Sequence, residues 1–168
     1  MAAVLAIGAV AGFSSHEPKR NFATPTALCD TPIEGKLLDP VLPRSGETIS
    51  MRAAGVIGWD RCLVSVDDEE VMSASFEWFE KGTKPVKVAK SQRNLVLVER
   101  VSDDGRYAWG DRGAVSHVTC PNPKVSSRKG TYELLASVYV VDAAKEEAMK
   151  KLVLGFAGAV SKSEECSG

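Results

Sequence analysis

Residues 62–78 read CLVSVDDEEVMSASFEW, and the alternation of apolar and polar side chains along this stretch decides the fold class. From Met72 to Trp78 every second residue is apolar, which places one set of side chains on the core side of a half-buried strand. The same alternation runs from Cys62 to Val66, and the acidic run between them, Asp67 to Glu70, predicts a hairpin turn. The stretch therefore predicts two antiparallel strands joined by a short turn.

Further strands are predicted on the C-terminal side of this hairpin. Residues 95–101 form one apolar run, and residues 107–109 lead through a glycine-containing turn into a return strand over residues 115–120. Residues 131–141 are apolar on both faces, as expected of a central strand that is covered on both sides. We therefore expect an α+β fold with a single domain, in which helices flank an antiparallel sheet of five or six strands.

A short N-terminal helix and a longer C-terminal helix complete this fold. The segment Thr31-Pro32-Ile33-Glu34 has the residue types of a capping box, and the prolines at positions 40 and 43 should end the first helix near Asp39. The second helix is predicted to be capped by Asp142. Its apolar residues recur at spacings of three and four, which makes it the expected lid over the sheet: Met149, Leu152, Val153, Phe156 and Val160.

The N-terminal residues predict export. Ala2 to Phe13 is about as long as the core of a signal peptide and shorter than the roughly 20 residues of a membrane span. No Lys or Arg precedes this run, so we expect that the true start lies upstream and that cleavage occurs at Ala9-Val10-Ala11. The alternative is a buried first strand or helix. We expect residues 1–13 to be a signal-peptide or anchor remnant, 14–28 a linker and 29–168 the disulfide-stapled domain.

The chain has four cysteines, Cys29, Cys62, Cys120 and Cys166. Their wide spacing lacks the paired C-x-x-C pattern of zinc and redox sites, whereas disulfides persist in the oxidising compartments that exported proteins reach. Four cysteines allow three pairings. We favour Cys29–Cys62 and Cys120–Cys166, because these bonds would tie the first helix to a neighbouring strand and the last helix to the sheet.

The surroundings of the cysteines resemble those in small exported four-cysteine proteins of actinobacteria, most of which are uncharacterised. The resemblance lies in a Cys that opens a short helix, one in an early strand, a Cys-Pro after a hairpin and a closing helix that ends in Cys: LCDTPIEGKLLDPVLP, WDRCLVSV, VSHVTCPNP and LVLGFAGAVSKSEEC. It implies an extracellular or cell-envelope location, and it implies neither an activity nor a functional residue.

Two groups of polar residues are candidate sites. His117 is the one histidine of the expected domain, but no G-x-S-x-G turn accompanies it, so we interpret it as a hydrogen-bonded or solvated strand residue rather than a general base. Asp67 to Glu70 carries oxygen ligands that suit Ca²⁺, yet its spacing differs from that of an EF-hand loop and favours a charged hairpin tip. We expect no catalytic residue, no metal site and no cofactor.

The sign of the charge reverses along the chain even though the formal net charge is only −1. Residues 67–80 hold six acids and no base, and residues 81–93 hold five bases and no acid: Lys81, Lys84, Lys87, Lys90 and Arg93. Pro85 within the basic segment favours a loop or edge strand over a helix. The segment is either an edge that Lys residues keep soluble or a surface that binds an anionic polymer or lipid.

These features together predict an exported or envelope-associated monomer that binds or interacts without catalysis. The expected partner is an unknown envelope component such as an anionic polymer or a lipid surface, and not a nucleic acid. The alternative function is a small hydrolase-like or lipid-carrying domain with a pocket between the sheet and the helices.

Overall fold

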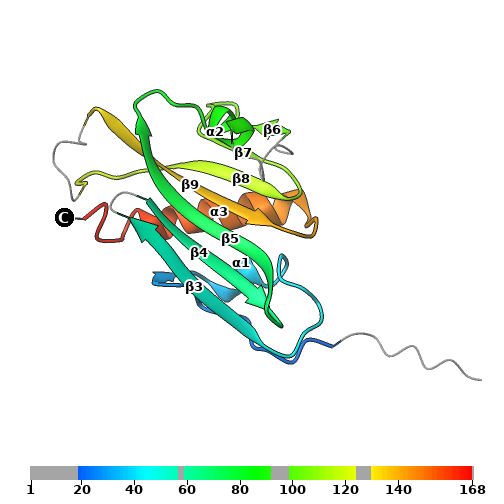
Figure 1. Ribbon diagram of the computed structural model, residues 1–168. Coiled ribbons are helices and arrows are strands. Elements are labelled where there is room, and N and C mark those ends of the chain that lie inside the picture. Colours follow the sequence, from blue (N-terminus) through cyan, green and yellow to red (C-terminus); the bar gives the residue numbers. More distant parts are fainter. Residues whose placement is uncertain (1–18, 57–58, 92–98, 124–129, 168) are drawn as a thin grey trace, which may run out of the picture.

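A computed structural model of the chain describes residues 19–56, 59–91, 99–123 and 130–167 (Figure 1). The expected signal peptide, its cleavage site, Arg93 and most of the predicted strand 95–101 lie outside the described residues. The elements follow in the order β1 (Ala27–Leu28), β2 (Thr31–Pro32), α1 (Gly35–Leu38), β3 (Ile49–Val56), β4 (Trp59–Val66), β5 (Glu69–Glu80), α2 (Pro85–Ser91), β6 (Arg100–Val101), β7 (Tyr107–Trp109), β8 (Gly113–Val118), β9 (Tyr132–Val140) and α3 (Glu146–Val160).

The main sheet is antiparallel and has the strand order β3-β4-β5-β9-β8-β7-β6. β9 lies between β5 and β8, which confirms that the doubly apolar run 131–141 is a central strand. The α+β class is confirmed, but the prediction of five or six strands is wrong, because the described residues form seven strands in this sheet and β1 pairs with β2 in a separate sheet of two. The unpredicted strand of the main sheet is β3, an edge strand whose side chains are mostly exposed and therefore lack a clear apolar alternation.

One face of the sheet carries the main core. α3 packs across this face against β8 and β9, and the five apolar residues predicted for its inner stripe are all buried. Burial of such side chains contributes about 1.5–3 kcal/mol each, so this contact dominates the attachment of the helix. The strands supply the opposite half of the core through the predicted alternating residues of β4 and β5 and through the central strand β9: Val64, Met72, Phe76, Leu134, Val138 and Val140.

The other face of the sheet is covered only by α2 among the described elements, and Figure 1 shows α2 and α3 on opposite sides. α2 packs on β7 and β8 and closes a smaller cluster of Val88, Ala89, Ala108, Val115 and Leu135. The expectation of a loop or edge strand over residues 81–93 is therefore wrong for residues 85–91. Pro85 is accommodated because it opens the helix, where the first backbone N–H groups have no intrahelical partner.

The predicted capping box at Thr31 is also wrong. Thr31 pairs with Leu28 in the β1–β2 hairpin, and the backbone N–H of Ile33 donates to the carbonyl oxygen of Thr26 at 2.9 Å. α1 begins only at Gly35, and Glu34 at its N-cap makes no side-chain capping bond. The residues that the sequence pattern assigns to the start of the helix therefore belong to the hairpin. The predicted end of the helix near Asp39 is confirmed.

The start of α3 differs from the prediction in a similar way. Its N-cap is Lys145 and not Asp142. The backbone N–H of Ala144 donates to the carbonyl oxygen of Asp111 at 2.8 Å, which ties the segment after β9 to the β7–β8 turn. The helix begins later in the sequence than predicted, because this bond holds the preceding residues against the neighbouring hairpin.

Two disulfides connect the elements in the favoured pairing. Cys29 in the β1–β2 turn is bonded to Cys62 on β4, and Cys120 after β8 is bonded to Cys166 after α3. The packed region also includes part of the expected linker 14–28, since Leu28 is buried and Arg20 donates from Nε to the carbonyl oxygen of Pro43 at 2.7 Å. The described part of the domain thus begins before Cys29.

Candidate functional site

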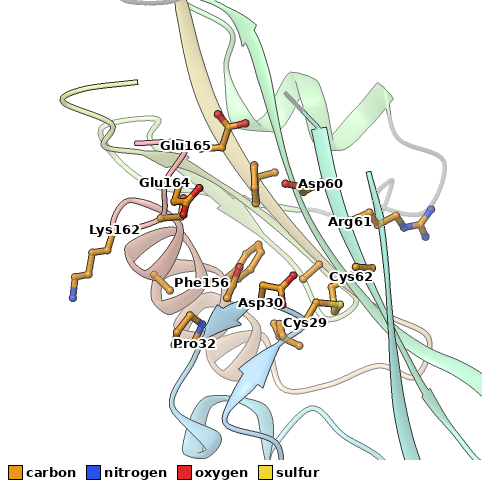
Figure 2. A pocket seen from close by; sticks show the side chains of 17 residues that line it. Cys29, Asp30, Pro32, Asp60, Arg61, Cys62, Phe156, Lys162, Glu164 and Glu165 are labelled. Carbon is orange, nitrogen blue, oxygen red and sulfur yellow. A yellow bond between two sulfur atoms is a disulfide. The ribbon is translucent and has the colours of Figure 1, made fainter. Parts of the chain in front are cut away.

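A cleft of about 680 Å³ lies between the main sheet, the β1–β2 hairpin and the C-terminal end of α3. Its volume is within the usual range of small-molecule sites, about 300–1,000 Å³. It opens on the same side of the sheet as the main core, where α3 ends and the chain continues toward Cys166. Figure 2 shows the side chains that surround it.

The floor of the cleft is hollow because small side chains meet there across three strands. Ala53 on β3 pairs with Cys62 on β4, and Cys62 pairs with Ala74 on β5, so that one row of the sheet carries no large residue. Phe76 on β5 and Phe156 on α3 border this row and are both buried. The floor is consequently apolar and partly aromatic.

The β1–β2 hairpin forms one wall, and the Cys29–Cys62 disulfide fixes it against the floor. The chain turns at Cys29 with a left-handed φ of 48°. Its backbone N–H lies 3.5 Å from Sδ of Met51, which places the turn over β3 as well as β4. Two residues of sheet pairing would not hold such a short hairpin by themselves, so the disulfide and the burial of Leu28 keep the wall in place.

The rim of the cleft is acidic. Asp30 and Asp60 approach from opposite walls, and Glu164 and Glu165 follow from the segment after α3. The two basic lining residues contribute little positive charge to the opening, because Figure 2 shows the side chains of Arg61 and Lys162 pointing away from it. Arg61 instead approaches Glu70 at 3.4 Å. The cleft therefore combines an apolar floor with a negatively charged mouth.

Among the described lining residues of the cleft, the serine and the two cysteines already have bonds of their own. Ser163 donates its hydroxyl hydrogen to the carbonyl oxygen of Val160 at 2.7 Å, so the Oγ is engaged in ending the helix. No histidine is among the lining residues, and both cysteines there form the disulfide. Within the described ranges, no group of three His, Cys, Asp or Glu side chains is placed to hold a metal ion.

His117 lies far from this arrangement and has a different partner. Its Nδ1 is 3.6 Å from Oε2 of Glu133, and Oε1 of Glu133 accepts a hydrogen bond from the backbone N–H of Gly82 at 2.7 Å. Burial lowers the pKa of His117 below its ordinary value, against the opposite effect of the Glu133 charge. Ser116 donates to the carbonyl oxygen of His117 rather than to the imidazole, so these residues do not form a hydrolytic triad.

The acidic turn at residues 67–70 is occupied by structural hydrogen bonds. Asp67 and Asp68 form the tight turn with φ values of 49° and 67°, whereas Glu69 and Glu70 already belong to β5. The Asp67 carboxylate accepts from the backbone N–H groups of Glu47 and Thr48, and these bonds lower its pKa. Asp67 thereby fastens the segment before β3 to the hairpin.

The basic segment forms one exposed surface along α2 and the turn before it. Lys84, Lys87 and Lys90 are all exposed and recur at intervals of three, opposite the buried Pro85, Val88 and Ala89. Lys81 is exposed in the turn that follows β5. The structure thus places Lys84, Lys87 and Lys90 on the exposed side of α2 and Lys81 in the preceding turn, on the face of the sheet opposite the cleft.

Sequence reasoning found Cys29 and Cys62 but missed the rest of the cleft. Asp30 and Asp60 are separated by thirty positions, and the glutamates come from the opposite end of the chain. One local signal was present: Asp30 follows Cys29 directly and Asp60 lies two positions before Cys62, and these two cysteines were expected to be bonded. No protein-family model, no curated protein and no solved structure matches this chain. None of the described helices has the length and apolar character that a bilayer span requires.

Proposed function

We propose that this protein is a non-enzymatic binding domain that works outside the cytoplasm and takes its ligand in the cleft beside the Cys29–Cys62 disulfide. The two disulfides are consistent with an oxidising extracellular environment. The observation that carries the proposal is the pairing of an apolar floor with an acidic mouth in one cleft of about 680 Å³.

The chemistry of the cleft indicates the class of ligand. The phenyl rings of Phe76 and Phe156 and the disulfide offer apolar contact, which favours a ligand with an apolar body. Asp30 and Asp60 face the opening from two sides, and two carboxylates in that arrangement attract a positive charge. The ligand is therefore an apolar molecule or peptide side chain that carries a cationic group.

Three probes with one hydrocarbon chain and different head groups test this proposal. We expect octyltrimethylammonium to bind more tightly than octanol, and octanol more tightly than octanoate, by calorimetric titration of the disulfide-bonded protein. Because a partly exposed ion pair contributes up to about 1 kcal/mol, Asp30→Asn and Asp60→Asn should each lower the affinity for octyltrimethylammonium by about fivefold at low salt. Both variants should leave octanol binding nearly unchanged.

Asp68→Asn provides the matched control, since it removes the same charge from an exposed turn at the other end of β4. It should not alter any of the three affinities. Equal affinities for the cationic and anionic probes, or full cation binding by the Asp30→Asn/Asp60→Asn double variant, would contradict the proposal.

A second function is favoured by the lysines of α2. Their shared exposure on the outer side of the helix supports contact with an anionic envelope polymer or lipid surface. Such contact would hold the protein at the envelope while the cleft, on the other side of the sheet, stays accessible. Asp103 and Asp104 border the groove beside Lys84 and reduce the positive field at that end of the surface.

A further inference from the structure

One edge of the main sheet is formed by β3, which pairs with β4 on one side only (Figure 1). Proteins usually protect such an edge with a short strand, a proline, a lysine or a bulge. β3 has none of these features: it is eight residues long, and its register with β4 is continuous from Ile49 to Val56. The strand at the opposite edge, β6, has only two residues. β3 is therefore the edge that offers room for a further strand.

One hydrogen bond shows which backbone groups of β3 are free. The backbone N–H of Asp67 donates to the carbonyl oxygen of Thr48 at 3.1 Å, and these two residues extend the β3–β4 register. Every second residue of an antiparallel strand bonds to the neighbouring strand, so the even-numbered residues of β3 bond to β4. Ala53 and Gly55 consequently direct their N–H and C=O groups outward. Within the described part of the chain, no group bonds to these outward atoms.

The cleft side of this edge carries an available negative charge. Ala53 and Gly55 are exposed, and Ala53 lines the cleft. Asp60 is the register partner of Gly55, and a Cβ added at Gly55 would meet Oδ1 of Asp60 first. The Asp60 carboxylate thus leans over β3 toward the free edge. It is exposed, and it forms no hydrogen bond or ion pair with another described residue.

The other side of the same edge is basic and apolar. Arg52 alternates with Ala53, so it points to the face opposite the cleft, where it is exposed and has no ion-pair partner among the described residues. Val56 points to the same face and is 70% exposed. A strand added to β3 would therefore meet a carboxylate on one face and a guanidinium group on the other.

We propose that β3 binds an extended peptide as a further antiparallel strand. Backbone bonds to Ala53 and Gly55 provide affinity, and the side chains of the peptide, which alternate between the two faces, provide specificity. The residue opposite Gly55 is basic and lies beside Asp60. The residue opposite Ala53 is small and apolar and enters the cleft. An acidic residue lies opposite Arg52 and an apolar one opposite Val56.

The peptide therefore reads apolar, basic, any residue, apolar, acidic in its own direction. This inference rests on the proposed function, because the basic side chain is the cationic group that the mouth of the cleft attracts. A second copy of the chain suits the edge less well. It would bring another acidic cleft mouth and another Arg52 to the same edge, and like charges on neighbouring strands destabilise a sheet.

The peptide Thr-Val-Lys-Thr-Val-Glu-Thr, blocked at both ends, tests the proposal by calorimetric titration of the disulfide-bonded full chain at low salt. We expect binding, and we expect the amide hydrogens of Ala53 and Gly55 to exchange with deuterium more slowly in the complex. N-methylation of the lysine and the second valine, whose N–H groups face β3, should weaken binding by about tenfold or more. N-methylation of the central threonine and the glutamate is the matched control. It should leave the affinity nearly unchanged, because their N–H groups face away from β3.

A charge exchange tests the register. A peptide in which lysine and glutamate are exchanged places like charges beside Asp60 and Arg52, so it should bind about tenfold more weakly. The protein variant Arg52→Glu/Asp60→Lys should bind the exchanged peptide as the wild type binds the original one.

Three results would overturn the inference: equal effects of the two N-methylation patterns, no protection of Ala53 and Gly55 in the complex, or a dimer in sedimentation that protects these amides without peptide. The inference also fails if the protein binds octyltrimethylammonium but not the peptide, and the proposed function then stands. If the protein binds neither probe, both are rejected.

Discussion

Two glycines of α3 permit a sharp test of how α1 is attached to the helix. Gly155 lies against Leu37 of α1, and a Cβ added at Gly155 would overlap Cδ1 of that leucine. Gly158, one turn further on, has no atom within 4 Å of the position where its Cβ would be. The substitutions Gly155→Ala and Gly158→Ala in this helix therefore differ in the contact with Leu37.

The expected free energies of unfolding follow from two opposing effects. Glycine costs about 1 kcal/mol relative to alanine inside a helix, so Gly158→Ala should stabilise the protein by about that amount. Gly155→Ala gains the same helix propensity but crowds Leu37, and overpacking of this kind costs typically about 1–3 kcal/mol. Leu37 is only half-buried and has some room to turn. We therefore expect the free energy of unfolding of Gly155→Ala to be about 1–2 kcal/mol lower than that of Gly158→Ala.

Urea unfolding followed by circular dichroism, with both disulfides intact, measures these differences. In a Leu37→Ala background the crowding disappears, and Gly155→Ala should then stabilise the protein as Gly158→Ala does. If Gly155→Ala stabilises the wild-type background as much as Gly158→Ala, Leu37 does not pack against α3 and the placement of α1 is wrong.

Two further predictions concern charge. Because the pKa of His117 is lowered in the folded protein, the unfolded chain binds more protons than the native state near the ordinary pKa of 6.5, so its contribution to stability is present above that pH and is lost as the pH falls below it. The urea midpoints at pH 7.5 and 5.5 should therefore differ less in His117→Gln than in the wild type. An unchanged difference would show that His117 is not the source of this pH dependence. The triple variant Lys84→Glu/Lys87→Glu/Lys90→Glu should abolish association with phosphatidylglycerol vesicles without a significant change in Tm, because exposed charges contribute little to folding. Association of the wild-type protein should weaken as the salt concentration rises. The control variant Lys36→Glu/Lys151→Glu/Lys162→Glu should retain more binding to the vesicles than the first variant.

Strong local patterns predicted the centre of this fold. Apolar side chains recur with a period of two in Cys62 to Val66 and in Met72 to Phe76, and with the helical period along the inner side of α3. In each element the local sequence alone was therefore enough to predict which side is buried. The doubly apolar run at residues 131–141 identified the central strand for the same reason. Four widely spaced cysteines after an apolar N-terminal run likewise predicted disulfides, and the favoured pairing joins segments that the fold makes neighbours.

The remaining features depend on contacts that no local pattern contains. Thr31 and Pro32 suit a helix start, but pairing with β1 and the bond from Cys29 to Cys62 hold them in a strand. Pro85 suggests a loop or edge strand, yet Pro85 opens a helix whose Val88 and Ala89 are buried against β7 and β8. The cleft arises only when the sheet sets small residues of separate strands side by side. Alternation along one strand determines which face a side chain occupies, whereas its neighbours on that face are determined by strand order and register.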